Sequence, residues 1–75
     1  MKIDQFKDLL DYSEPSFGYN GKEYAISSPN GKFHVWAEDS AQDVDLEFAT
    51  KDELLDNWNI QGKKLREIIG YIEIN

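Results

Sequence analysis

Carboxylate side chains crowd the middle of the chain, where they could hold a cation. Within ten residues the sequence places Glu38, Asp39, Asp43, Asp45 and Glu47. Oxygen ligands of this kind attract hard cations such as calcium. The spacing nevertheless differs from the calcium-binding loop D-x-[DN]-x-[DN]-G with its glutamate at position twelve, and the glycine of that loop is missing. The segment therefore indicates at most weak, non-specific cation binding, and we predict no metal site.

The same carboxylates are also candidates for acid–base catalysis. A catalytic pair needs burial or a close like charge to separate its two pKa values. Asp43, Asp45 and Glu47 are spaced two apart, so on a strand they share one face, and the apolar residues between them occupy the other. This alternation favours a solvated acidic surface, and we predict no catalytic residue.

Nucleophilic and phosphate-binding chemistry lacks the residues it needs. The chain has no cysteine and one histidine, His34, and no serine lies in a G-x-S-x-G elbow. Gly62-Lys63-Lys64 is similar to the end of a phosphate-binding loop, but Lys64 stands where the G-x-x-x-x-G-K-[ST] pattern needs Ser or Thr. We therefore expect no enzyme and no cofactor. A small metal-dependent hydrolase that uses the carboxylates of residues 38–47 is the least favoured hypothesis.

Two other features indicate a binding surface. From Glu38 to Asp56 the chain carries eight acidic residues and one base, Lys51. Such a stripe can imitate nucleic-acid phosphates and occupy a basic groove of another protein, although acidic residues also keep a small protein soluble and protect a sheet edge. The second feature is Trp36, with His34 beside it, because exposed aromatic residues are enriched at interfaces. Trp36 could instead pack under a loop or under the first helix.

The elements that must position these residues begin with a helix. Residues 3–12 have apolar side chains at helical spacing, so we predict one short amphipathic helix there, with Asp4 as a candidate cap. Pro15 disfavours helical geometry before it, so the helix should end near Tyr12 or Ser13.

A hairpin follows the helix. Asn20-Gly21 between two alternating apolar runs is a strong hairpin signal, which predicts that Tyr19 pairs with Lys22 and Phe17 with Tyr24. Residues 28–31 form the next turn, and an even four-residue loop would pair Ser27 with Lys32. This even loop directs Phe33 and Val35 into the core and leaves His34, Trp36 and Glu38 outside. A three-residue loop with a bulge would turn Trp36 inward instead.

The second half of the chain reads as a third strand followed by helices. Residues 43–49 alternate as a long strand, and Thr50 with Glu53 forms a capping box that opens a helix. A last helix is predicted to start near Gly62. The residues from Tyr71 to Ile74 could end that helix or form a closing strand.

Length and charge limit the classes of partner. Seventy-five residues make one domain, 1–75, and the 15 acidic against 8 basic residues give a formal charge of −7. This charge repels DNA phosphates and anionic lipids, so we expect neither direct nucleic-acid binding nor a membrane partner. The first residues lack the apolar region of a signal peptide, which predicts a cytoplasmic protein.

Three segments carry a resemblance to a known group of proteins. They are residues 19–26, YNGKEYAI, residues 48–55, FATKDELL, and residues 60–69, IQGKKLREII. From Phe17 onward the chain resembles a loose group of short uncharacterised proteins of Gram-positive bacteria and their phages. The resemblance implies an accessory or mobile-element setting, and it carries no functional residue.

Together these patterns predict an α+β domain. It has an N-terminal helix, a three- to four-stranded antiparallel meander, and two C-terminal helices packed on one sheet face. The leading hypothesis is a non-enzymatic acidic interaction module that binds a protein partner or a second copy of itself. The alternative is a nucleic-acid-mimicking inhibitor of a DNA-binding or phage-defence protein. The surface proposed for binding consists of His34, Trp36, Glu38, Asp43, Asp45 and Glu47.

Overall fold

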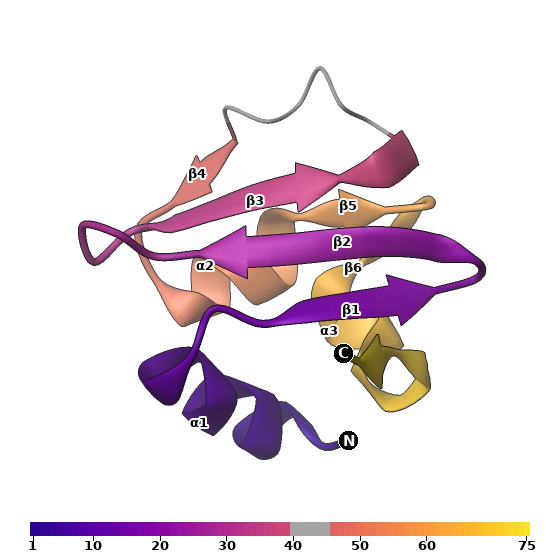
Figure 1. Ribbon diagram of the computed structural model, residues 1–75, viewed down its shortest axis with the longest axis horizontal. Helices are drawn as coiled ribbons and strands as arrows, with labels where there is room; N and C mark the ends of the chain where they lie inside the picture. Colours follow the sequence, from indigo (N-terminus) through magenta and orange to yellow (C-terminus); the bar gives the residue numbers. More distant parts are fainter. Residues whose placement is uncertain (40–45) are drawn as a thin grey trace.

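The described part of the chain forms a five-stranded antiparallel sheet, a separate two-stranded hairpin and three α-helices. The computed structural model describes residues 1–39 and 46–75. In chain order the elements are α1 (Ile3–Tyr12), β1 (Ser16–Tyr19), β2 (Lys22–Ser27), β3 (Phe33–Ala37), β4 (Glu47–Phe48), α2 (Lys51–Asn57), β5 (Asn59–Ile60), β6 (Lys63–Lys64), α3 (Leu65–Ile68), the 3-10 turn η2 (Ile69–Tyr71) and β7 (Glu73–Ile74). The main sheet has the order β4-β3-β2-β1-β7, and β5 pairs with β6 (Figure 1). The predicted α+β class is confirmed.

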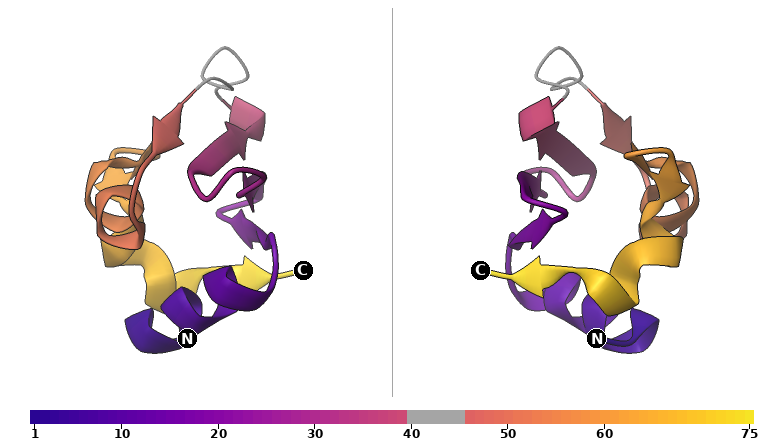
Figure 2. Two further views of the ribbon diagram at one scale, coloured as in Figure 1. Left: turned by 90° about the vertical axis from the view of Figure 1, so that its left-hand side faces the viewer. Right: turned by 90° about the vertical axis from the view of Figure 1, so that its right-hand side faces the viewer.

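The helices all lie toward one face of the main sheet. Figure 2 shows the sheet along one side of the molecule, with α2, α3 and the β5–β6 hairpin on the other side and α1 closing one end. The core between them joins side chains from every layer: Phe6, Leu10, Phe17, Tyr24, Ile26, Phe33, Val35, Ala37, Leu54, Leu55, Trp58, Ile60, Leu65, Ile68 and Ile69. The opposite sheet face carries no helix of the described residues, so we call it the open face.

The β1–β2 hairpin forms as its turn residues predict. Asn20 and Gly21 have φ angles of 48° and 80°, the left-handed pair that a type I′ turn requires. Tyr19 pairs with Lys22, and Phe17 with Tyr24. Phe17 and Tyr24 therefore share the inner face, where their rings stack with centroids 5.4 Å apart.

The β2–β3 register differs from the prediction by two residues. Ser27 pairs with His34 and not with Lys32, so the four-residue loop is wrong. The longer loop sets the small side chain of Ala37 opposite Tyr24, which leaves room for the buried tyrosine ring. A shift of two residues keeps every side chain on its face. The predicted parity is therefore confirmed, and the bulged alternative that would bury Trp36 is wrong.

The C-terminal half corrects one prediction and decides between two alternatives that the sequence left open. Where a helix was expected from Gly62, residues 59–64 form the β5–β6 hairpin, with φ angles of 53° at Gln61 and 85° at Gly62. The helix begins only at Leu65. The alternative closing strand is confirmed, because β7 pairs with β1, with Ile74 opposite Phe17.

The helix starts agree with the sequence in one of two cases. Thr50 caps α2, since its side chain accepts a hydrogen bond from the Glu53 backbone N at 3.1 Å. Asp4 is not the cap of α1. Lys2 occupies the cap position, and its backbone N donates to the Gln5 Oε1 at 2.8 Å. Asp4 falls inside the first turn, where it favours the positive end of the helix dipole. α1 ends at Tyr12, as Pro15 predicts.

The predicted third long strand is described only at its end. Glu47 and Phe48 form β4, which pairs with β3. The rest of that prediction, including Asp43 and Asp45, lies outside the described residues.

Candidate functional site

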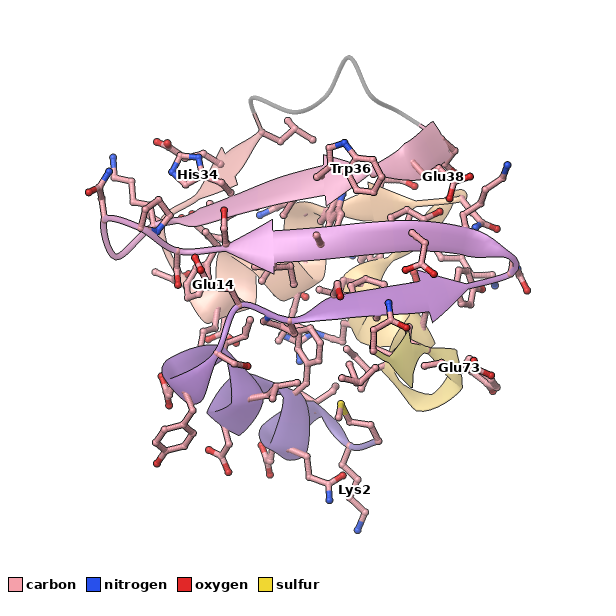
Figure 3. The ribbon with its side chains drawn as sticks, viewed as in Figure 1. Lys2, Glu14, His34, Trp36, Glu38 and Glu73 are labelled. Atoms are coloured by element: carbon pink, nitrogen blue, oxygen red, sulfur yellow. The ribbon has the colours of Figure 1, made fainter. Side chains whose placement is uncertain are left out.

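The open face presents carboxylates around an aromatic centre. Residues opposite one another in an antiparallel pair point to the same side of the sheet. The register therefore places on this face Gly18, Glu23, Ala25, Ser27, His34, Trp36, Glu47 and Glu73. Figure 3 shows His34 and Trp36 along β3 and Glu38 just beyond its end, with Glu73 at the opposite edge of the sheet. No helix from the described part of the chain covers these side chains.

Trp36 lies at the centre of this face and is 41% exposed. Its cross-strand partner is Ala25, whose methyl group does not cover the indole. A shallow groove runs beside it, lined by Glu14, Ala25, Ile26, Ser27, His34, Val35 and Trp36. An indole in such a position has one part embedded in its own sheet and another available to a partner.

His34 and Glu47 form a cross-strand pair at one end of the face. The β3–β4 register sets them directly opposite each other. The His34 Nε2 lies 3.5 Å from the Glu47 Oε2, and the Lys32 Nζ lies 3.4 Å from the Glu47 Oε1. Glu47 therefore has two basic side chains within 3.5 Å, one at each oxygen, whereas among the described residues Glu38 has one such side chain, Lys22, at 3.8 Å; this leaves Glu47 less available than Glu38 to another cation.

Glu38 and Glu23 form the other end of the face. The Glu38 Oε1 accepts a hydrogen bond from the Glu23 backbone N at 3.1 Å, and its second oxygen lies 3.8 Å from the Lys22 Nζ. The Glu23 Oε2 accepts from the Asn75 Nδ2 at 2.7 Å. Both carboxylates are thus held at the surface by contacts that leave them solvated, and they make this end of the open face negative.

Glu14 enters the groove from the segment before β1. Its Oε2 accepts a hydrogen bond from the Ser28 backbone N at 2.7 Å, which fixes the start of the β2–β3 loop. The contact also fixes the carboxylate at the rim of the groove that Trp36 lines. Figure 3 shows Glu14 beside the strands of the open face.

The structure places four of the six residues that the sequence predicted for the binding surface. His34, Trp36, Glu38 and Glu47 lie on one face as predicted, and Asp43 and Asp45 lie outside the described residues. The sequence reasoning missed Glu14, Glu23 and Glu73. Glu23 could have been found, because counting by twos from Ala25 places it on the same face. Glu14 precedes Pro15 in a connection without periodicity, so no sequence signal places it there.

On the helical side of the molecule, carboxylates form ion pairs with lysine and arginine side chains. Lys7 lies 2.8 Å from the Asp52 carboxylate, the Arg66 Nε lies 2.7 Å from Asp56, and Lys51 pairs with Asp11. A hydrogen bond from Lys7 lowers the pKa of Asp52, and one from Arg66 lowers the pKa of Asp56. The positive charge of Arg66 is therefore paired within the helical layer.

Other kinds of site find little support in the described part of the chain. Within residues 1–39 and 46–75, no three His, Cys, Asp or Glu side chains gather closely enough to hold a metal ion. None of the helices in these ranges has the length and apolar character needed to cross a bilayer. Comparisons of the chain with family models, with curated proteins and with solved structures find no match.

Proposed function

We propose that this chain is a non-enzymatic protein-interaction module that binds a protein partner through its open face. The observation that carries the proposal is the 41% exposure of Trp36 on a sheet face that none of the described helices covers. Burial of aromatic side chains dominates the energy of most interfaces, and tryptophan is enriched among the residues that contribute most. A partner that covers the indole would bury the part of the Trp36 side chain that the fold leaves exposed.

Two more exposed aromatic residues help to define the proposal. Tyr12 and Tyr71 are 87% and 77% exposed, but they project from a helix end and a turn. Trp36 differs because it lies in a groove between strands, where a partner can contact both the ring and its surroundings. We expect the module to act in the cytoplasm, in the accessory or mobile-element setting that the resemblance to short proteins of Gram-positive bacteria and their phages implies.

The test is affinity capture with matched variants. The full chain, tagged at its N-terminus, is compared with Trp36→Ala and with Tyr12→Ala in extracts of the source cell. We expect a protein that the parent and Tyr12→Ala retain equally and that Trp36→Ala loses at least tenfold. Equal capture by all three, or no specific capture from a chain that sediments as a monomer at high concentration, would reject the proposal.

A second candidate function is inhibition of a DNA-binding or phage-defence protein by mimicry of nucleic acid. It is favoured by the number of carboxylates that the fold directs to one side: Glu14, Glu23, Glu38, Glu47 and Glu73. Binding by mimicry depends on charge spacing, so it should weaken steeply with salt and tolerate Trp36→Ala. Binding that needs the indole and changes little with salt would eliminate this candidate.

A further inference from the structure

We propose that the open face takes an arginine-bearing segment of its partner, with one guanidinium group stacked on the Trp36 indole and paired with the carboxylate of Glu38. This inference rests on the proposed function and names the chemistry of the occupant. Trp36 supplies the aromatic surface at the centre of the face, and Glu38 follows it by two residues on the same side of β3.

The aromatic surface is the first requirement for this occupant. A cation over an aromatic ring is attracted by the negative charge of the ring face, and tryptophan gives the strongest attraction. The small side chain of Ala25 opposite Trp36 leaves the space beside the indole open, so a flat group can lie along the groove. Arginine is suited to this space because its guanidinium is planar and weakly hydrated.

The carboxylates are the second requirement. Glu38 follows Trp36 by two residues, just beyond the end of β3 at Ala37, and Figure 3 shows both side chains on the same side of the sheet. A guanidinium whose plane lies against the indole can direct its N–H donors to this carboxylate. Glu14 lines the groove next to Trp36, where it can pair with a second arginine. Both carboxylates already accept one backbone hydrogen bond, so they are held in place before a partner arrives.

Charge also decides between a foreign partner and a second copy of the chain. Two open faces brought together would oppose carboxylates to carboxylates, since among the described residues only Lys22, Lys32 and His34 form ion pairs with them at this face. Like charges held close together in an interface are unfavourable. A basic segment has the complementary charge, and we therefore infer a heterologous partner.

The test uses short peptides of defined charge and the full-length chain. The probe is a blocked peptide in which serine alternates with arginine, compared with versions that carry citrulline, the neutral isostere of arginine, or lysine. Binding is followed by the NMR signal of the Trp36 indole N–H, assigned with Trp36→Phe. We expect the arginine peptide to shift this signal in a saturable way, the citrulline peptide to leave it unchanged, and the lysine peptide to bind about fivefold more weakly.

Variants then separate this geometry from general attraction to an acidic protein. Glu38→Gln keeps the acceptor for the Glu23 backbone N and removes the charge, and we expect it to weaken the arginine peptide several-fold. Asp8→Asn is the matched control, because it removes one charge from an exposed position of α1 on another side of the molecule. It should leave the affinity within twofold of the parent.

Several outcomes would overturn the inference. They are equal weakening by Asp8→Asn and Glu38→Gln, equal binding of the arginine and lysine peptides, equal binding of the citrulline peptide, and no shift of the Trp36 signal. None of these affects capture of a protein that depends on Trp36, so the proposed function would stand if that capture succeeds. If neither the Trp36-dependent capture nor the expected peptide binding is observed, both proposals are rejected.

Discussion

Tyr24 and Trp36 lie on neighbouring strands but on opposite faces of the sheet, and the two side chains differ in how far they are buried. Tyr24, on the inner face, is 1% exposed and Trp36, on the open face, is 41% exposed. The Tyr24 ring stacks on Phe17 and meets the edge of Trp58, with centroids 5.4 and 6.0 Å apart. Among the described residues, the sheet register sets Ala25 opposite Trp36. The inner aromatic residue is needed to build the domain, whereas the outer one is left available for contact with another molecule.

The hydroxyl group of Tyr24 adds hydrogen bonds to this packing. The Tyr24 hydroxyl donates to the Asp39 Oδ2 at 3.0 Å and accepts from the Gln61 Nε2 at 2.9 Å. Gln61 also donates to the Tyr19 carbonyl at 3.0 Å, so it joins the β5–β6 turn to the first hairpin. Buried polar groups usually have such partners. The inner face is therefore fixed in geometry, and differences in its residues should appear as differences in stability.

Phe17→Ala is expected to have the largest effect. Phe17 is fully buried and contacts the rings of Phe6, Tyr24 and Trp58. Truncation would leave a cavity at the centre of these rings and cost about 3–5 kcal/mol of unfolding free energy. This is a large part of the total for a small domain. Urea unfolding followed by circular dichroism measures it, and a loss below about 1 kcal/mol would contradict the assignment of the inner face.

Tyr24→Phe tests the polar part of the inner face. It keeps the ring and removes the hydroxyl, so Gln61 and Asp39 lose a partner. We expect a loss of about 1 kcal/mol of unfolding free energy, the usual size for a hydrogen-bonded group. Tyr12→Phe is the control, because the Tyr12 side chain is 87% exposed, and it should change the stability very little. Equal values for the two variants would mean that the hydroxyl contacts of Tyr24 contribute nothing.

The pH dependence of stability gives an independent measure of the same hydroxyl. Burial, as the largest cause, raises the pKa of Tyr24 above its ordinary value, and the Asp39 carboxylate adds to the increase. The folded state therefore holds this proton more tightly than the unfolded state, whose tyrosine pKa is about 10. The stabilisation is complete below pH 10 and is lost as the pH rises through the folded pKa.

The measurement is thermal unfolding between pH 9 and pH 11. The parent should lose more stability over this range than Tyr24→Phe, since the other tyrosines are common to both proteins. Parallel curves for the two proteins would contradict a buried, protonated hydroxyl.

The sequence predicts the two faces well because a register error of two residues leaves every side chain on its face. Asn20-Gly21 specifies its turn locally, and alternation then assigns Phe17, Tyr24 and Trp36 to their faces. The β2–β3 loop length has no comparable signal, so its register was missed by two residues without changing any face. The site was predicted where it follows from alternation and missed at Glu14, whose place depends on tertiary contacts with Ser28.

The second hairpin shows the limit of local patterns. Gln61-Gly62 adopts the same left-handed pair of φ angles as Asn20-Gly21. Glutamine, however, is a weaker turn signal than asparagine, and Lys63 and Lys64 give no apolar alternation after it. The hydrogen bonds from the Gln61 side chain to the first hairpin stabilise the turn, and such long-range contacts are not visible in a sequence pattern.

Trp36→Ala is expected to have the smallest effect on stability, and it tests the other half of the comparison. Among the described residues, the sheet register gives the indole one cross-strand neighbour, Ala25, and such a contact is worth at most about 1 kcal/mol. The variant should therefore unfold at nearly the same urea concentration as the parent and keep its circular dichroism spectrum. A loss comparable to that of Phe17→Ala would mean that the indole is a structural side chain, and it would remove the reason for assigning a binding role to the open face. A stable Trp36→Ala that no longer captures a partner would instead separate the surface used for binding from the residues that build the fold.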